Sequence, residues 1–485
     1  MGNKILLNLT ALKIIPMEIL HVSAECYPVA KAGGLADVVG ALPKYQNEFG
    51  HIAKVVTLMH RTKFLYEHEF DVVHKGSFGM GMYWFNYTII KEKINSLGFD
   101  LYLVDINGLL DRERIYGYDD DIERFTAFQI AVVDWVSKWE HLPDVMHVHD
   151  HHTALIPFMM QHCYAYQKLS GIKTILTIHN AQYQGWMGWD KSVYIPEWDS
   201  WKSGLLEWEN TINSLASGIK CASKVTTVSN SYLDELRVSA NGLEKLFEYE
   251  RGKCVGILNG IDDDVWDPAT DSYLHANYGV SDAAAGKLKN KQKLCKQFNL
   301  DVKKPLIIFI GRLVNDKSAD LLPGVIGDAL YHLKAGMNFL VLGSGDPHIE
   351  WELGNMSYQY VGYYNSRIGY NEQLSHQMYA GADFLLMPSR VEPCGLNQFY
   401  AMRYGTIPIV RNTGGLKDSV IDIGDTGGYG IKFYNADVGD ITNAIYRGIK
   451  LYENASLLKD TRDTLMLLDN SWEKSTGMYL ELYKQ

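Results

Sequence analysis

The sequence predicts a two-domain α/β protein in which both sheets are doubly wound. Strand-like runs alternate with helical stretches along the chain, and several runs are almost continuously apolar, as in parallel strands covered on both faces. The chain has 485 residues and a hydrophobic content of 47%, which exceeds what one domain usually holds. Two domains of roughly 200–250 residues are therefore expected.

The apolar runs place the expected strands, and helical stretches such as 124–138 and 372–380 lie between them. The alternation stops over residues 261–302, which contain a lysine-rich helical patch, so we predict the domain boundary near residue 262. Strands are expected at residues 18–23, 53–58, 100–105, 145–149, 173–179 and 224–229, and then at 306–311, 339–343, 358–362, 384–388 and 406–410.

The charge and cysteine content restrict the classes of partner and compartment. Lysine and arginine number 46 against 57 aspartate and glutamate residues, which argues against nucleic acid or an anionic membrane as the main partner. The six cysteines form no Cys-x-x-Cys pair, and no apolar run approaches the roughly 20 residues that span a bilayer. We therefore expect a reduced, cytoplasmic protein. Met17 directly precedes the first expected strand, and residues 1–16 are interpreted as a dispensable extension.

A pair of glycines follows the first expected strand. Lys31, Gly33 and Gly34 precede a helical stretch that contains Asp37. Glycines at the start of a helix let backbone N–H groups approach a phosphate, and the helix dipole favours the anion. An ordinary tight turn with a solvated lysine explains the same residues, and both interpretations stay open. The spacing matches neither the dinucleotide fingerprint nor the P-loop, which disfavours a nicotinamide dehydrogenase.

Histidines gather at the end of the expected strand 145–149. Four histidines and Asp150 lie between His147 and His152. A zinc site, plain structural packing, and an active site formed by Asp150 with His152 all remain open here. The next expected strand ends at His179, and the amide side chains that follow it can hydrogen-bond several hydroxyls of one sugar ring.

Charged residues also follow the strands of the second half. Arg312 and Lys317 share one strand-end loop and suit a diphosphate, because arginine grips oxygens bidentately and lysine adds a point charge. Glu392 is interpreted either as a carboxylate at a helix N-terminus or as a clamp for sugar hydroxyls. The acidic run at 262–264 is either a solvated hinge loop or the metal-binding D-x-D of another transferase class.

Taken together, these motifs resemble the bacterial glycogen synthase and plant starch synthase family of retaining glucosyltransferases. The resemblance covers nearly the whole chain and implies the GT-B fold, with two Rossmann-like domains around a deep cleft. It assigns residues 17–262 to the first domain, 263–465 to the second, and 466–485 to a C-terminal helix that crosses back to the first. The motifs in chain order are Lys-x-Gly-Gly-Leu, His-x-His-Asp-x-His, His-Asn-x-x-Tyr-Gln-Gly, Leu-Asn-Gly-Ile-Asp, Arg-Leu-x-x-x-Lys, Glu-Pro-Cys-Gly-Leu and Thr-Gly-Gly-Leu.

The resemblance also implies roles for individual residues. It implies that Asp150, His179 and Glu392 are catalytic, that Tyr370 stacks on the base, and that no metal or cofactor is required. The residues implied to hold the donor are Lys31, Gly34, Asp37, Asn259, Arg312, Lys317, Tyr370, Cys394, Gly395 and Leu396. The sequence departs from the family pattern at Ala32, His151, Ser318 and Asn397.

The implied reaction transfers glucose from a nucleotide sugar to the non-reducing end of an α-1,4-glucan such as glycogen, with retention of configuration. We expect ADP-glucose as the donor in preference to UDP-glucose, and cations from both domains around one diphosphate. Another GT-B glucosyltransferase and an inactive glycan-binding or regulatory protein are the alternatives. The sequence does not indicate an oligomeric state.

Overall fold

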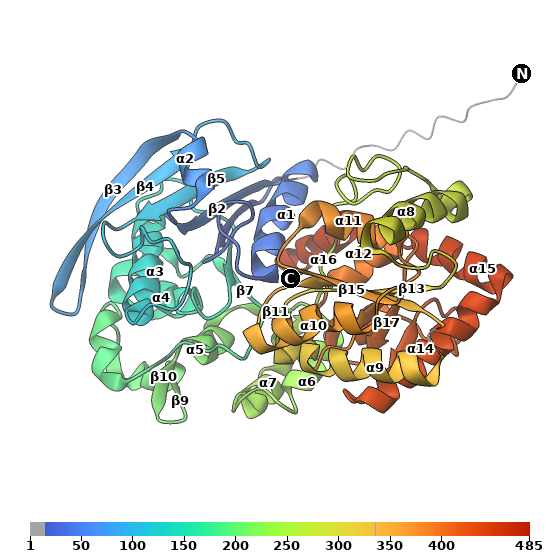
Figure 1. Cartoon of the computed structure of the whole chain (residues 1–485). Coiled ribbons are helices and arrows are strands. Elements are labelled where there is room, and N and C mark those ends of the chain that lie inside the picture. Colours follow the sequence, from blue (N-terminus) through green and yellow to red (C-terminus); the bar gives the residue numbers. More distant parts are fainter. Residues whose placement is uncertain (1–14, 335) are drawn as a thin grey trace, which may run out of the picture. The chain divides into compact units, whose positions relative to one another are not determined.

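The computed structural model describes residues 15–334 and 336–485 and divides into two compact units (Figure 1). The first unit runs to Val225 and includes Leu480–Gln485, and the second is Thr226–Tyr479. The last residues of the chain therefore belong to the first unit, in agreement with a C-terminal helix that returns to it. The domain boundary near residue 262 stays a prediction, and the interpretation of residues 1–16 falls almost entirely outside the described residues.

The first unit is built around a mostly parallel sheet in which seven strands run in the order β7-β6-β1-β2-β5-β4-β3. The pairs from β7 to β5 are parallel, and the hairpin β3–β4 joins antiparallel to β5. A three-stranded sheet, β8-β10-β9, lies apart from it. The elements are β1 (Glu18–Val22), α1 (Gly34–Glu48), β2 (Ile52–Leu58), α2 (Lys63–Glu67), β3 (Phe70–Met80), β4 (Tyr83–Glu92), β5 (Asp100–Asp105), α3 (Asp121–Ser137), β6 (Val145–His149), α4 (Ile156–His162), β7 (Lys173–Ile178), β8 (Trp186–Met187), β9 (Glu207–Trp208), β10 (Thr211–Asn213) and α5 (Ser214–Cys221), with β11 (Lys224–Thr227) at the unit boundary.

The strand order of this sheet reverses at β1. The chain builds outward from β1 through β2 and β5 on one side, and through β6 and β7 on the other. The loops after β1 and β6 therefore leave the sheet at a topological switch point, where open α/β sheets bind their ligands. Lys31 lies on the first of these loops and Asp150 on the second.

The second unit contains a fully parallel sheet in the order β15-β14-β13-β16-β17-β18, with its own switch point between β13 and β16. In Figure 1, α9 and α14 cover one face of this sheet and α8 and α11 the other. The elements are α6 (Asn230–Leu236), α7 (Glu244–Tyr249), β12 (Cys254–Gly256), α8 (Ala283–Phe298), β13 (Leu306–Ile310), α9 (Leu322–His332), β14 (Asn338–Gly343), α10 (Pro347–Gln359), β15 (Tyr364–Ile368), α11 (Glu372–Gly381), β16 (Phe384–Met387), α12 (Asn397–Arg403), β17 (Ile407–Arg411), α13 (Gly414–Ser419), β18 (Ile431–Phe433), α14 (Val438–Glu453), α15 (Ala455–Met466) and α16 (Trp472–Lys484).

Two parts of the fold differ from the expected elements. The strand expected at 358–362 is wrong, because α10 continues to Gln359 and the strand β15 begins only at Tyr364. Aromatic and β-branched residues at 358–362 suggested a strand, but the helix begun at the Asp346 cap runs into them. The hairpin β3–β4 was not expected, because its strands alternate buried and exposed residues at a sheet edge instead of forming an apolar run.

None of the helices in the described parts of the chain combines the length and the apolar content needed to cross a bilayer. All six cysteines have free thiols, and five of them are buried. The structure therefore contains no cross-link between these cysteines.

Candidate functional site

The loop after β1 brings Lys31 and Asp37 together. Lys31 Nζ lies 2.7 Å from Asp37 Oδ1, and both side chains are partly exposed. Helix α1 begins at Gly34, so its first N–H groups point away from the helix without intrahelical partners and carry the positive end of the dipole. This loop can offer both backbone N–H groups and an ammonium group to an anion.

Glu25 organises the same loop and was not found from the sequence. Its Oε2 accepts hydrogen bonds from the N–H groups of Ala32 (2.5 Å) and Gly33 (2.9 Å), and the hydroxyl of Tyr116 donates to its Oε1 at 2.6 Å. The N–H groups left for an anion therefore begin at Gly34. Glu25 follows the carboxyl end of β1 closely, where open α/β sheets bind their ligands, and this position was the available signal.

Asp150 and His179 are brought together at the carboxyl ends of β6 and β7. Asp150 Oδ1 accepts hydrogen bonds from the backbone N–H groups of His179 (2.7 Å) and Asn180 (3.4 Å). Burial raises the pKa of Asp150 to about 7, against the opposing effect of these two N–H groups. Burial lowers the pKa of His179 to about 3, so its imidazole is neutral. A carboxyl group near its titration point and a neutral histidine can both hydrogen-bond sugar hydroxyls.

The three interpretations of the histidine run are now distinguished in part. His152 packs against the rings of Tyr116 and Phe125, with centroids 4.8 Å and 4.6 Å away, so it is a core residue and not a partner of Asp150 in the structure. His147 and His149, with His21 on β1, place three nitrogen atoms within 4.8 Å of one another. All three rings are fully buried, and an ion there would need compensating charge that neutral imidazoles do not supply.

The loops after β13 and β16 in the second unit bring Lys317 and Glu392 together. Lys317 Nζ lies 2.6 Å from Glu392 Oε2, and the hydroxyl of Ser389 donates to the same oxygen at 2.8 Å. Glu392 is 6% exposed, so its carboxylate is held inside the protein by these partners. The structure therefore places these two predicted site residues in contact, and their roles stay predictions.

Arg312 lies on the same loop as Lys317 and is an exposed residue. The backbone on either side of it is fixed, because Gly311 N–H donates to Leu342 O at 3.1 Å and Leu313 N–H to Ser344 O at 2.8 Å. Among the residues that the structure describes, Arg312 forms no ion pair. A ligand can therefore pair with the charge of Arg312, and the backbone that carries Arg312 is already held in place.

Arg390 ties these two loops together and was also missed. Its guanidinium group bonds both carboxylate oxygens of Asp320, at 2.5 Å and 2.8 Å, and reaches Asn315 O at 2.8 Å. The backbone N–H of Arg390 donates to Asp316 O at 2.8 Å. A bidentate arginine–carboxylate pair has a fixed geometry, so the Lys317 loop is held in register with the Glu392 loop. An arginine two residues before Glu392 was the available signal.

The second glycine loop, residues 413–416, packs against the backbone of Glu392 and Cys394. Gly415 N–H donates to Glu392 O at 3.0 Å, and Cβ atoms at Gly414 and Gly415 would overlap with Glu392 O and Cys394 O. The loop is itself held by Glu235, which accepts from Gly414 N–H at 2.7 Å. These glycines therefore permit a close backbone approach that shapes the loop containing Glu392.

Asn259 and Cys394 are neighbours in the second unit. The backbone of Asn259 hydrogen-bonds the Cys394 thiol, and burial raises the pKa of that thiol to about 12, which makes it a poor nucleophile. Asn259 is 6% exposed, and its Oδ1 has no hydrogen-bond partner within residues 15–334 and 336–485. A buried amide oxygen without a partner is costly, and a ligand hydroxyl would satisfy it.

The remaining predicted residues lie in two loops of the second unit. Gly395 adopts a φ of 75° and Leu396 is the N-cap of α12, so both belong to the turn that follows Glu392. Tyr370 follows β15, is 83% exposed, and its hydroxyl donates to Glu372 at 3.2 Å. The ring of Tyr370 is exposed at a strand end, and its stacking on a base stays a prediction.

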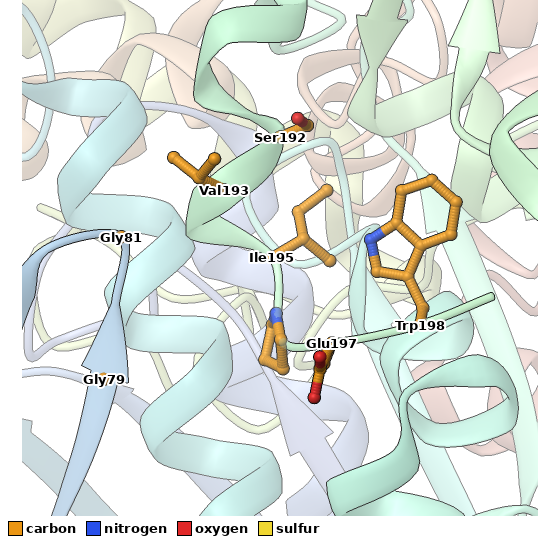
Figure 2. A pocket seen from close by; sticks show the side chains of 8 residues that line it. Gly79, Gly81, Ser192, Val193, Ile195, Glu197 and Trp198 are labelled. Carbon is orange, nitrogen blue, oxygen red and sulfur yellow. The ribbon is translucent and has the colours of Figure 1, made fainter. Parts of the chain in front are cut away.

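A separate cavity of about 440 Å³ lies under the turn of the β3–β4 hairpin in the first unit. Figure 2 shows the side chains of Ile195 and Trp198 beside it, with Gly79 and Gly81 of the hairpin on the other side. None of the predicted site residues lines this cavity. It is distinct from the residues at the two switch points.

Comparison with known proteins identifies the class of fold. The catalytic domain of starch synthase IV from Arabidopsis thaliana, solved with ADP and acarbose, superposes with a TM-score of 0.86 at 32% identity, covering 97% of this chain and 99% of that one. Sucrose-phosphate synthase from Thermosynechococcus elongatus shares the fold at a TM-score of 0.61 and 17% identity, covering 96% of this chain and 98% of that one. The chain is a glycosyltransferase with the GT-B fold.

Sequence comparison then gives the family. Residues 18–249 match the model of the starch synthase catalytic domain, and residues 290–457 match that of the group 1 glycosyl transferases. Glycogen synthase of Flavobacterium johnsoniae is 54% identical over 467 residues, which cover 96% of this chain and 98% of that protein. The chain belongs to the glycogen synthase and starch synthase family of glucosyltransferases.

Proposed function

We propose that the protein transfers glucose from ADP-glucose to the non-reducing end of an α-1,4-glucan, with retention of configuration. The observation that carries this proposal is the pair Lys317–Glu392 beside the exposed Arg312 at the switch point of the second unit. Two cations suit the diphosphate of a nucleotide sugar, and a buried carboxylate next to them suits the hydroxyls of the attached sugar. The donor is further supported by the ADP in the structure of the related starch synthase IV.

The proposed chemistry is governed by charge. As the anomeric C–O bond breaks, negative charge accumulates on the diphosphate and positive charge on the glucosyl ring. Arg312 and Lys317 stabilise the diphosphate, and removal of one such group typically costs about 3–4 kcal/mol of transition-state stabilisation. N–H groups at the start of α1 and the ammonium of Lys31, paired with Asp37, are a further anion-binding group. No step is assigned to a metal ion or to a cofactor.

Retention is explained by attack from the face that the leaving group departs from. The departing phosphate oxygen accepts the proton of the acceptor hydroxyl O4 while the new bond to the anomeric carbon forms. Glu392 holds the glucosyl unit during this step, and the catalytic roles of Asp150 and the main-chain carbonyl of His179 stay predictions. Retaining hydrolases instead use two carboxylates about 5 Å apart to pass through a covalent intermediate. Trapping a glucosyl group on any side chain would contradict front-face attack.

Two alternatives remain to be separated by experiment. A UDP-glucose-dependent synthase would keep the same cations and differ only at the nucleobase. An inactive glycan-binding protein would have no need for a diphosphate clamp, so the retained Arg312, Lys317 and Glu392 argue against it. We place the reaction in the cytoplasm, which is supported by six free thiols.

The test supplies purified protein with glycogen and either ADP-glucose or UDP-glucose, and measures nucleoside diphosphate release and incorporation of labelled glucose. Transfer with ADP-glucose is expected to be the faster. Absence of transfer with both donors would contradict the enzymatic function, and faster transfer with UDP-glucose would contradict only the choice of donor.

Glu392→Gln tests the site within this assay. The amide keeps the size of the side chain but loses the ion pair with Lys317, and hydrogen bonds to charged groups contribute about 1.5–3 kcal/mol, so kcat should fall about 10- to 100-fold. Glu248→Gln, on an exposed side chain of the same unit, is the matched control and should keep full activity. Normal turnover in Glu392→Gln would show that Glu392 does not take part in the reaction.

A further inference from the structure

A continuous chain of hydrogen bonds runs through the first unit from Gln46 to His179. Gln46 Oε1 lies 2.8 Å from His21 Nε2, and His21 Nδ1 lies 3.1 Å from His149 Nε2. His149 Nδ1 in turn lies 3.1 Å from His179 Nε2. The three imidazoles come from the neighbouring strands β1 and β6 and from the loop after β7, and Gln46 lies on α1. Parallel pairing of these strands is what aligns the rings.

The amide of Gln46 is oriented by the C-terminal segment of the chain. Gln46 Nε2 donates to the hydroxyl oxygen of Tyr483 at 3.0 Å, which leaves Oε1 of the same amide facing His21. The Tyr483 hydroxyl oxygen also lies 2.7 Å from His147 Nδ1, and His147 Nε2 lies 2.6 Å from Thr177 Oγ1. Tyr483 is 2% exposed, so this arrangement is enclosed within the unit.

The orientation of Gln46 determines which nitrogen carries the proton in each of the rings of His21, His149 and His179. An amide oxygen only accepts, so His21 must donate through Nε2–H, and its unprotonated Nδ1 must accept from His149 Nε2–H. The unprotonated Nδ1 of His149 must then accept from His179 Nε2–H. Each ring carries a single proton, because burial lowers the pKa of His21 to about 4 and of His179 to about 3, and that of His149 well below its usual value.

We propose that Gln46, His21 and His149, oriented by Tyr483, are positioning residues that hold His179 as its Nε2-protonated tautomer and present Nδ1 as an acceptor for a sugar hydroxyl. The identity of the ligand as a sugar rests on the proposed function, whereas the tautomer does not. His179 keeps 8% of its surface exposed, and its backbone N–H is anchored by Asp150 Oδ1 at 2.7 Å. Separate hydrogen bonds thus fix the backbone and the ring of His179. Through Gln46, Tyr483 near the end of the chain helps to orient the ring of His179, which lies 304 residues earlier.

The same nitrogen atoms can be compared with a metal site. His21, His147 and His149 offer three ligand atoms within 4.8 Å. In the structure, however, the nitrogens of these rings face Gln46, Tyr483, Thr177 and one another at hydrogen-bond distance, so a bound ion would have to replace several of these contacts. The hydrogen-bonded chain satisfies the buried groups without introducing a charge.

The direct test is nitrogen-15 NMR of protein labelled at histidine, with the His179 signals assigned by their loss in His179→Gln. The expected result is a proton on Nε2 and none on Nδ1 of His179. A proton on Nδ1 would overturn the proposal, as would stoichiometric zinc retained by the purified protein. This measurement needs no substrate, so it stands even if the protein fails to transfer glucose.

A kinetic test uses Tyr483→Phe, which removes the hydroxyl that orients Gln46. The His179 tautomer should become mixed, and kcat should fall about three- to tenfold, the effect of losing one neutral hydrogen bond, while the Kd for ADP stays unchanged. Tyr87→Phe is the control, because it removes a buried tyrosine hydroxyl of the same unit that donates to Asp134 at 2.7 Å, away from the chain of histidines. Equal kcat in both variants, with a single unchanged tautomer in Tyr483→Phe, would overturn the proposal. Absence of transfer in the unmodified protein would instead contradict the proposed function alone.

Discussion

The two glycine loops of this protein look alike in sequence but have different surroundings. Both read Gly-Gly-Leu at the start of a helix, and in both a glutamate accepts the loop N–H groups, Glu25 in the first unit and Glu235 in the second. A Cβ atom at Gly34 would meet nothing within 4 Å, whereas one at Gly415 would overlap with the backbone of Cys394. The first loop therefore leaves space that a ligand can enter, and the second uses its glycines for packing.

The contrast extends to the polar groups around each loop. In the first unit, the residues at the strand ends beyond the glycine loop are buried, hydrogen-bonded groups such as the neutral His179, together with Asp150. In the second, charged groups dominate, with Arg312 exposed and Lys317 paired to Glu392. Neutral buried groups select hydroxyls by geometry, and exposed cations select phosphates by charge. The strand ends of the first unit therefore offer mainly neutral hydrogen-bonding groups, and those of the second unit offer mainly charged groups.

The largest effect is expected from removing a charge in the second unit. Arg312→Ala should lower kcat about 100- to 1,000-fold, because loss of one preorganised group at developing charge typically costs about 3–4 kcal/mol. Rates of ADP release with glycogen present measure this effect. Arg251→Ala, at an exposed arginine of the same unit, should retain full activity. If Arg312→Ala turned over normally, Arg312 would not belong to the diphosphate-binding group.

Most of this difference between the polar groups of the two units could be predicted from the sequence, because it depends on where parallel strands end. Polar residues follow four of the apolar runs, either directly or after a short loop, so Asp150, His179, Arg312 and Glu392 could be placed near strand ends without knowing the packing. The notable exception is the strand expected at 358–362, where the helix α10 prevailed over local β propensity.

Contacts between distant segments could not be predicted in this way. Glu235 reaches Gly414 across 179 residues, and Tyr483 reaches His147 across 336 residues. Neither contact leaves a local pattern, since a glutamate on one helix carries no sign of which loop it will hold. The same limit explains why Glu25 and Arg390 were missed as organisers of their loops, although their positions near strand ends were visible.

Alanine at one glycine of each loop tests the contrast directly. Gly415→Ala should reduce the free energy of unfolding by about 1–3 kcal/mol, the usual cost of overpacking, because the Cβ overlaps with backbone that cannot rotate away. Gly34→Ala should leave the stability within about 0.5 kcal/mol and instead weaken donor turnover. Denaturant unfolding and kcat/KM for ADP-glucose separate the two outcomes. Equal loss of stability in both variants would show that the first loop is also a packing device.

The pH dependence of transfer tests the first unit. Burial raises the pKa of Asp150 to about 7. An acid loses its proton as pH rises, so activity that uses the carboxylate should increase with pH and level off above about 7, with a change of about tenfold per pH unit well below the pKa. Asparagine tolerates the positive φ of position 150. In Asp150→Asn, the rising limb of the plot of kcat/KM against pH should therefore disappear. Persistence of the limb in Asp150→Asn would assign it to another group.

The smallest expected effect concerns the loop that carries Lys317. Ser318, one of the departures from the family pattern, adopts a φ of 53° and is fully buried, and its hydroxyl has no partner among the described residues. Ser318→Gly should therefore raise the free energy of unfolding by about 1 kcal/mol, because glycine adopts positive φ without strain. Ser318→Ala separates the two causes, since it removes the hydroxyl but keeps the Cβ atom. Denaturant unfolding measures both variants. If Ser318→Ala stabilised the protein as much as Ser318→Gly, the unpartnered hydroxyl would lower the stability at this position, and the backbone of the Lys317 loop would be unstrained.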